Sequence, residues 1–133
     1  MRHFVQYHNS EKMGYPCDGV VTFRILTNKP VTALPANTIW LISGEGNPRQ
    51  YALCAVFIAD DVGATQEKGF SRYASGERGQ FFRPPLPLNE RAWFGDFLTS
   101  QQNFSLGLRE IPASFVEELE ALLADSIGSN RIP

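Results

Sequence analysis

The sequence "TIWLISGEGNPRQYALCAVFIAD", residues 38–60, contains the clearest structural signal in the chain. Two apolar runs rich in β-branched and aromatic residues, 38–43 and 50–59, flank the segment "GEGNPRQ" at 44–50. Glycine, asparagine and proline favour turns, so this pattern predicts a β-hairpin. The first half of the chain is therefore expected to be built around a β-sheet.

Shorter runs on either side of the hairpin predict further strands. Residues 3–8 and 19–26 precede it, and the glycine-punctuated segment 67–88 predicts two short strands joined by "SGERG". The stretch 28–37 is too rich in proline for a regular element and is expected to be a surface connection. Alternating apolar residues predict a last strand over 103–111.

Two helices are predicted in the second half of the chain. Residues 88–102 place apolar side chains on one helical face after an N-cap residue, Asn89. Ser114 and Glu117 have the spacing of a capping box ahead of an apolar stripe, and Gly128 follows the end of that stripe. The expected fold class is α+β, with a curled sheet or small β-barrel and two helices at one side.

Composition limits the classes of protein to which the chain can belong. Its 133 residues, 43% of them hydrophobic, predict a single domain over 1–133. A net charge of −2 argues against coating nucleic acid by bulk attraction, although local basic patches remain compatible with it. No run of 18 apolar residues and no secretory signal pattern is present, so we expect a cytoplasmic protein without a membrane partner.

The residues that usually carry catalysis or metal binding are sparse. His3 and His8 are five positions apart on one predicted strand, so they should point to opposite faces and cannot form one cluster. Cys17 and Cys54 form no Cys-x-x-Cys pair and are expected to be reduced thiols, with Cys54 buried. The glycine-rich loops match no phosphate-binding motif. We therefore expect no catalytic residues, no metal and no cofactor.

Two adjacent carboxylates follow the second strand of the predicted hairpin. Asp60 and Asp61 could act as paired acids, but two acidic residues at the end of a strand more commonly serve solvation. We expect the second role here.

Aromatic, amide and basic residues then carry most of the functional information. Binding an unstacked base requires flat faces for stacking, polar groups that read its edge, and cations for neighbouring phosphates. Tyr7, His8 and Asn9 lead the first strand into a loop, and Trp40 lies in the hairpin. The predicted phosphate contacts are Lys12, Arg72, Arg78 and Arg83. Each of these residues also has a plainer reading, as a polar turn, a core aromatic or a solvated surface charge.

The order of these motifs resembles the EVE domain family, whose relatives are the PUA, ASCH and YTH domains. "HFVQYHN" (3–9) is similar to that family's opening strand, and "NTIWLISGEGNPRQYALCAVFIADDV" (37–62) to its central hairpin. "PPLPL" (84–88) followed by "LTSQQNFSLGLREIPASFVEELEALL" (98–123) resembles its closing strand and helix. The resemblance extends over nearly the whole chain.

The resemblance implies a PUA-like barrel with a central pocket that accepts a flipped, often modified, base of DNA or RNA. It also implies a non-catalytic reader, which in restriction-type systems is often joined to a nuclease. Carried over by position, the base-pocket residues would be Tyr7, His8, Asn9, Trp40, Ser43, Phe104 and Ser105.

Two other functions remain open. A small-molecule-binding or hydrolytic relative, as some ASCH-like domains are, would need a catalytic group in the pocket, and Lys12 with Tyr7 or Tyr15 is the available set. A protein-interaction adaptor would instead use segment 70–85 as an exposed apolar patch.

Overall fold

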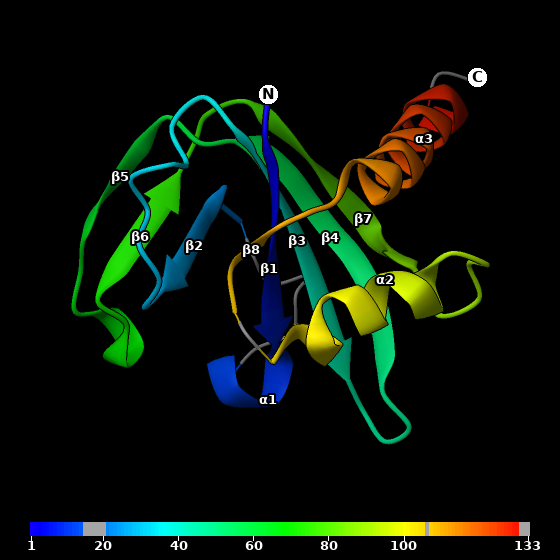
Figure 1. Cartoon of the computed structure of the whole chain (residues 1–133), viewed down its shortest axis with the longest axis horizontal. Coiled ribbons are helices and arrows are strands. Elements are labelled where there is room, and N and C mark those ends of the chain that lie inside the picture. Colours follow the sequence, from blue (N-terminus) through cyan, green and yellow to red (C-terminus); the bar gives the residue numbers. More distant parts are fainter. Residues whose placement is uncertain (15–20, 106, 131–133) are drawn as a thin grey trace.

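The computed structural model describes residues 1–14, 21–105 and 107–130, apart from the side chains at 11, 12 and 127–130. The chain is an α+β fold with a five-stranded mixed sheet, a three-stranded sheet and the two longer helices on the outer face of the larger sheet (Figure 1). The strands are β1 (His3–Asn9), β2 (Arg24–Thr27), β3 (Thr38–Glu45), β4 (Gln50–Ile58), β5 (Asp61–Ala64), β6 (Arg72–Ser75), β7 (Gly79–Pro87) and β8 (Arg109–Glu110). The helices are α1 (Ser10–Met13), α2 (Phe94–Ser100) and α3 (Ala113–Asn130), with 3₁₀ turns η2 (Glu67–Gly69) and η3 (Gln102–Phe104).

The predicted hairpin forms the centre of the larger sheet. Its strand order is β7-β4-β3-β1-β8, and β3 pairs antiparallel with β4 from Thr38↔Ile58 to Glu45↔Gln50. β1 lies parallel to β3, while β8 adds two antiparallel pairs at Phe4 and Val5. The hairpin prediction is confirmed, and the strand predicted over residues 3–8 is present as β1.

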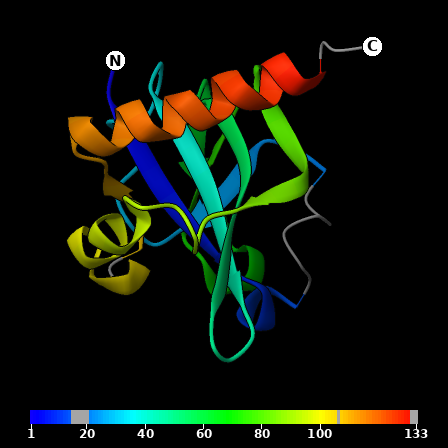
Figure 2. The same ribbon diagram turned by 90° about the vertical axis from the view of Figure 1, so that its right-hand side faces the viewer.

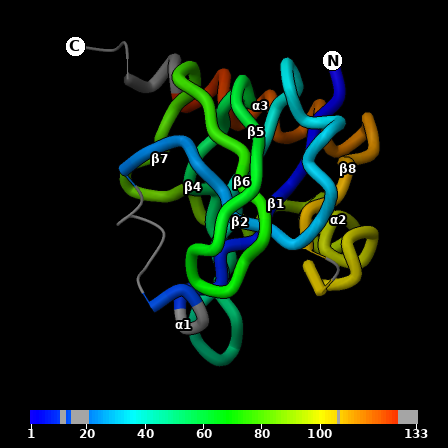
Figure 3. The backbone as a smooth tube through the Cα atoms, turned by 90° about the vertical axis from the view of Figure 1, so that its left-hand side faces the viewer, coloured from blue at the N-terminus to red at the C-terminus, as the bar shows by residue number. Residues whose placement is uncertain are grey.

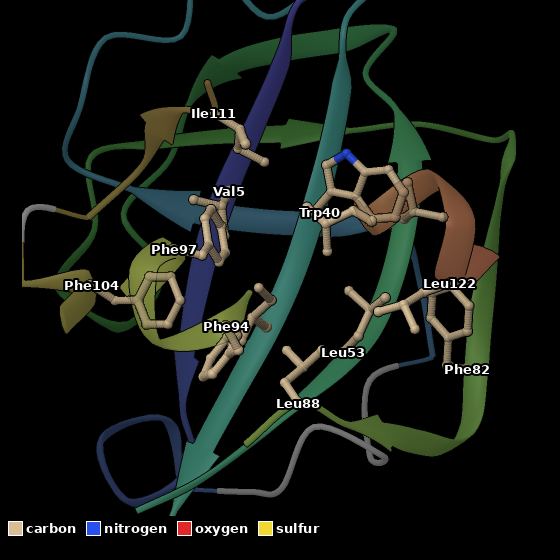
Figure 4. Packing of buried hydrophobic residues seen from close by; sticks show 13 residues of the cluster. Val5, Trp40, Leu53, Phe82, Leu88, Phe94, Phe97, Phe104, Ile111 and Leu122 are labelled. Atoms are coloured by element: carbon tan, nitrogen blue, oxygen red, sulfur yellow. The ribbon is translucent and has the colours of Figure 1, made fainter. Parts of the chain in front are cut away.

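Side chains of the larger sheet alternate between two hydrophobic cores. Phe4 and its neighbour on β3, Ile39, belong to a core shared with the smaller sheet. Val5 and its neighbour Trp40 belong to a second core under α2 and α3 (Figure 4). Because successive side chains of a strand point to opposite faces, a single strand supplies both cores.

The smaller sheet, with order β2-β6-β5, covers the other face of the larger one; Figure 3 views the molecule from its side. The prediction of a strand over 19–26 is partly wrong, since β2 begins only at Arg24 and residues 15–20 lie outside the described part. β5 was not predicted from the sequence. Asp61 is its first residue, whereas only the end of the preceding strand was expected there.

The strands on either side of "SGERG" are present, but β6 and β7 belong to different sheets. The described strands do not close into a barrel, which leaves the curled-sheet form of the prediction. Segment 28–37 contains no helix or strand, as expected, yet Leu34 is only 1% exposed, so the segment contributes to the core and is not merely a surface connection.

The C-terminal helix is confirmed, and it crosses the larger sheet with Leu119 and Leu122 in the second core (Figure 2). It begins at Ala113, so Ser114 lies within its first turn and does not serve as the predicted N-cap. It continues to Asn130, so the prediction that Gly128 follows its end is wrong. The middle helix is shorter than predicted and begins at Phe94. Asn89 is no N-cap because its side chain accepts a hydrogen bond from the Tyr51 amide at 2.6 Å.

The strand predicted over 103–111 is wrong for most of its length. Among the described residues of that range, only Arg109–Glu110 form a strand, and it pairs with β1. Asn103 and Phe104 instead belong to η3, where their backbones are left-handed, with φ of 57° and 61°. The alternating pattern was misleading because Phe104 is buried by a turn and not by a strand.

The prediction of a reduced thiol at Cys54 is also corrected. Cys54 is buried, at 4% exposure, and is disulfide-bonded. Cys17, the other cysteine of the sequence, lies outside the described residues. Because disulfides persist mainly in oxidising compartments, the cytoplasmic location stays a prediction. None of the described helices has the length and hydropathy needed to cross a membrane.

Candidate functional site

A cavity of about 670 Å³ lies at the carboxyl end of β1, between the ends of the two sheets. Its walls come from segments far apart in the sequence: β1, the start of β2, the start of β4, and the two 3₁₀ turns. The residues used below are Gln6, Tyr7, His8, Asn9, Arg24, Arg49, Tyr51, Glu67, Lys68, Asn103, Phe104 and Ser105. We refer to this cavity as the strand-end pocket.

One wall of the strand-end pocket is aromatic. The rings of Tyr7 and Phe104 are stacked, with centroids 5.3 Å apart and an interplanar angle of 11°. Tyr51 lies 6.1 Å from Tyr7 and meets Phe104 edge to face at 5.7 Å. Phe104 is only 5% exposed and also contacts Phe97, so this wall is continuous with the second core. Aromatic pairs in such geometry stabilise each other by about 0.5–1.5 kcal/mol beyond their burial.

A strained turn brings Phe104 to the pocket. Gln102, Asn103 and Phe104 have φ of 49°, 57° and 61°, three consecutive left-handed residues without a glycine. This conformation costs about 1–2 kcal/mol per residue for side chains other than glycine, asparagine or aspartate. The amide of Phe104 donates to the carbonyl of Gln101 at 3.0 Å, and the Ser105 hydroxyl donates to the carbonyl of Gln102 at 2.6 Å. Strain of this kind is concentrated at ligand sites in proteins.

Glycine at position 44 makes room for the aromatic wall. Gly44 is paired with Asn9 in the register of β1 and β3, and the Tyr7 ring lies directly over it. A Cβ at Gly44 would lie 2.8 Å from Cε1 and 2.9 Å from Cζ of Tyr7, and closer still to its hydroxyl oxygen. The missing side chain therefore sets the position of Tyr7.

A second wall is polar. His8 is only 5% exposed, and Gln6 donates through Nε2 to the carbonyl of Leu26 at 3.1 Å, which joins β1 to β2. The other side-chain atom of that amide, Oε1, is buried and has no hydrogen-bond partner among the described residues. Asn9 and Asn103 add further amides to the lining.

Charged residues of both signs line the outer part of the pocket. Arg24 forms an ion pair with Glu67 at 2.8 Å, and its guanidinium carbon lies 4.9 Å from the centroid of the Tyr73 ring. The Tyr73 hydroxyl in turn donates to Asp61 at 2.8 Å, and this hydrogen bond raises the pKa of Tyr73. Arg24 is thus held on two sides, by a carboxylate and by a ring.

Asp60 and Asp61 are engaged in hydrogen bonds of the smaller sheet region. Asp60 accepts from the amide of Glu77 at 3.2 Å, and Asp61 accepts from Tyr73. These contacts give both carboxylates a structural role.

Five of the seven residues predicted for the base pocket line the strand-end pocket, namely Tyr7, His8, Asn9, Phe104 and Ser105. Trp40 does not line it. Its side chain is 0% exposed on the helix-facing side of the sheet, and its indole N–H donates to Nδ1 of His3 at 3.0 Å. Ser43 is 2% exposed and is also absent from the lining.

The predicted phosphate contacts are not brought together here. Arg72 donates to the carbonyl of Asn28 at 3.3 Å, and Arg83 lies 4.6 Å over the ring of Phe81. Arg78 borders a different cavity beside α3. The side chain of Lys12 lies outside the described part of the structure.

Sequence reasoning missed several of the pocket residues. Arg24, Tyr51, Glu67 and Lys68 stood out in no motif, because their segments meet only in the folded chain. Arg49 and Asn103 lay in a predicted turn and a predicted strand. The sequence did contain one indication of Arg49, because this cation directly follows the glycine, asparagine and proline of the central hairpin turn.

His3 occupies a separate cavity, of similar volume, on the helix side of the sheet. Its ring stacks on Trp40, and its Nε2 lies 3.5 Å from Oε1 of Glu120 on α3. Burial lowers the pKa of His3, while Glu120 acts in the opposite direction. Because Nδ1 accepts from Trp40, this histidine is held neutral with its proton on Nε2. His3 and His8 therefore lie on opposite faces of β1, as their spacing predicted.

The segment considered for a protein-interaction patch is mostly packed. Phe82 is 2% exposed in the second core, and Phe81 stacks on Phe23 at 4.3 Å. Among the described residues, Met1 and Val21 are the large hydrophobic side chains that are strongly exposed. The structure therefore offers the adaptor hypothesis no broad apolar surface at 70–85.

In chemical terms, the strand-end pocket combines flat rings, amides and a mixed-charge rim. In the described ranges, no cluster of three or more His, Cys, Asp or Glu side chains has the geometry of a metal site. Such a lining suits the binding of a planar, hydrogen-bonding ligand. No protein-family model matches the chain, and no curated protein sequence matches it.

Proposed function

We propose that this protein is a non-catalytic nucleic-acid-binding module that accepts a base of DNA or RNA in the strand-end pocket. The observation that carries the proposal is the convergence of Tyr7 and Phe104 with His8, Asn9 and Ser105 at one cavity. The rings offer a stacking surface, and the amide, imidazole and hydroxyl groups can read the edge of a base. Arg24, Arg49 and Lys68 lie in the same lining, as a phosphate-bearing ligand requires.

The proposal extends to the family suggested by the sequence. We propose a PUA-like, EVE-like domain that recognises a modified base and works beside a partner such as a nuclease. An open, curled sheet with a ligand pocket at its strand ends supports the idea. In this proposal the base contacts are Tyr7, His8, Asn9, Phe104 and Ser105.

Fluorescence anisotropy with modified and unmodified oligonucleotides over a salt series tests the proposal. We expect binding at low salt that weakens when Tyr7 is replaced by leucine, because an aromatic stacking surface contributes about 1–3 kcal/mol per base. Arg83→Ala is the matched control, since Arg83 lies outside the pocket on Phe81. Absence of binding to every oligonucleotide at low salt would refute the function.

A second candidate is binding or hydrolysis of a free nucleoside or another small molecule. The pocket volume of about 670 Å³ favours it, because small-ligand pockets typically measure about 300–1,000 Å³. Screening nucleosides for hydrolysis, with Lys12→Ala as the test variant, distinguishes the two functions. A reader domain produces no turnover, whereas a hydrolase produces turnover that this substitution removes.

A further inference from the structure

We propose that the cavity between α3 and the larger sheet is a second ligand site, which takes a small organic anion with an aliphatic body, such as a medium-chain carboxylate. The proposal does not depend on the function of the strand-end pocket. It rests on the size of the cavity, on its apolar walls, and on an arginine at one end that pairs with no carboxylate of the described chain. We refer to this space as the helix-side cavity.

The helix-side cavity has a volume of about 670 Å³ and lies where α3 crosses the larger sheet (Figure 2). Sites for small ligands typically measure about 300–1,000 Å³. Its lining has no described residue in common with the lining of the strand-end pocket. The two cavities are therefore separate sites on opposite faces of the larger sheet's hairpin, and each can bind a ligand of its own.

The strand register sets the length of the helix-side cavity. His3 pairs with Thr38, and Thr38 pairs with Ile58. The amide of Ile58 then donates to the carbonyl of Arg78 at 3.0 Å, at the start of β7. These four residues form one row across the sheet, and residues directly opposite each other carry their side chains on the same face. Since neighbouring strands lie about 4.8 Å apart, the two ends of the row are about 14 Å apart.

Between the two ends of this row the accessible walls are apolar. Ile58 is partly buried on the sheet side, and α3 contributes Leu123 and the exposed Ala124. Met1 adds a 77% exposed side chain, whose sulfur accepts a hydroxyl hydrogen bond from β3 at 2.9 Å. Trp40, at 0% exposure, closes the base beneath them. An aliphatic chain placed here gains from burial, and the flexible methionine adapts to its shape.

The two ends of the cavity differ in charge. Arg78 is exposed and forms no ion pair or side-chain hydrogen bond within the described ranges. Gln80 lines the same end and adds an amide donor, whereas Glu77, next to Arg78 in the chain, does not line the cavity. At the opposite end the Glu120 carboxylate lies 3.5 Å from Nε2 of His3.

This polarity orients the ligand. A guanidinium presents donors that match the two oxygens of a carboxylate, so the anionic head is held at Arg78. Glu120 repels an anion from the other end, where only the uncharged part of the ligand is accommodated. A carboxylate with an aliphatic tail therefore fits the cavity in one direction, with its tail along Ile58 and Leu123.

Isothermal titration calorimetry with butanoate, hexanoate, octanoate and decanoate tests the proposal, with octanol as the uncharged counterpart of octanoate. We expect one site per chain and an affinity that rises by up to about fourfold for each methylene that becomes buried. Octanoate should bind about two- to fivefold more tightly than octanol, which is the range of an exposed ion pair. Amide chemical shifts recorded with octanoate should change at Ile58, Gln80 and Leu123.

Two pairs of variants locate the site. Arg78→Gln should reduce octanoate binding to the level of octanol and leave octanol binding unchanged. Arg83→Gln is its matched control, because Arg83 lies over Phe81 and outside the cavity. Ala124→Trp should fill the cavity and weaken both ligands by at least about tenfold, since the tail then loses its buried surface. Ala121→Trp is the control on α3, at an exposed position outside the lining.

Four results would overturn the proposal. They are the absence of saturable octanoate binding, equal binding of octanoate and octanol by the unsubstituted protein, and octanoate-induced shifts that centre on Tyr7 and Phe104. The fourth is a set of shifts at Ile58, Gln80 and Leu123 that follows protein concentration without ligand, because a second copy of the chain would then cover the cavity. None of these results bears on oligonucleotide binding, so the proposed function is tested separately.

Discussion

Replacing Gly44 by alanine tests the architecture of the aromatic wall most directly. The added Cβ would lie 2.8–2.9 Å from two ring carbons of Tyr7, where ordinary van der Waals contact begins at 3.4 Å. The ring must therefore move away from Gly44 by more than half an ångström, and we expect this shift to disturb its stack on Phe104. Overpacking of this kind typically costs about 1–3 kcal/mol. Loss of the 5.3 Å stack adds about 0.5–1.5 kcal/mol.

We therefore expect Gly44→Ala to lower the free energy of unfolding by about 1.5–4.5 kcal/mol, as measured by urea denaturation. Near-ultraviolet circular dichroism should change as well, because the environment of Tyr7 is altered. Gly95→Ala is the matched control: no atom lies within 4 Å of its Cβ position, and the residue is in α2. This control should be neutral or stabilising by up to about 1 kcal/mol, since alanine favours helices over glycine.

A double-mutant cycle identifies the cause of the effect. In a Tyr7→Ala background the clash disappears, so Gly44→Ala should then cost less than about 0.5 kcal/mol. If Gly44→Ala destabilises both backgrounds equally, or changes neither, the position assigned to the Tyr7 ring is wrong.

Three further predictions concern pH, the disulfide and the pocket ion pair. Burial lowers the pKa of His3 below its ordinary 6.5, so the unfolded chain binds more protons and stability falls as the pH drops below about 6.5. The slope from this residue should not exceed about 1.4 kcal/mol per pH unit, and His3→Gln should flatten urea-derived stability between pH 5 and 7; an unchanged profile would contradict this. Cys54→Ala should lower stability by about 2–4 kcal/mol in oxidised protein and much less in dithiothreitol, whereas a melting temperature indifferent to reductant would show that no disulfide contributes. Arg24→Gln should cost under about 1 kcal/mol, and less still in 1 M salt, because Arg24 and Glu67 are 31% and 54% exposed; a larger, salt-independent loss would count against a solvent-screened pair.

Part of the candidate site could be found from sequence because one strand contributes it contiguously. The last three residues of β1 are Tyr7, His8 and Asn9, and all three line the pocket. Their polar and aromatic character at the end of a predicted strand was sufficient to identify them. Trp40 was placed on the pocket wall by its position in the hairpin. The structure buries it under the helices, because it pairs with Val5, which lies on the same face of β1 as Tyr7 but two residues further from the strand end.

Local patterning determined the elements with strong periodicity. The central hairpin and the C-terminal helix follow from apolar runs and turn residues that act within a few positions of each other. The same reasoning failed over 103–111, where an alternating pattern predicted a strand. A left-handed turn at Gln102–Phe104 forms there instead, because packing of Phe104 against Tyr7 and Phe97 offsets its backbone strain.

By itself, therefore, the sequence determined an α+β chain with a central hairpin, a late amphipathic helix and a polar, aromatic end to its first strand. Only the tertiary structure decided that β6 and β7 enter different sheets, that the curled sheet stays open, and that Arg24, Glu67 and Tyr51 meet Tyr7 at one pocket. The physical reason is the range of the interactions. Turn chemistry and side-chain periodicity act between near neighbours, whereas sheet order and pocket composition depend on burial shared by segments distant in sequence.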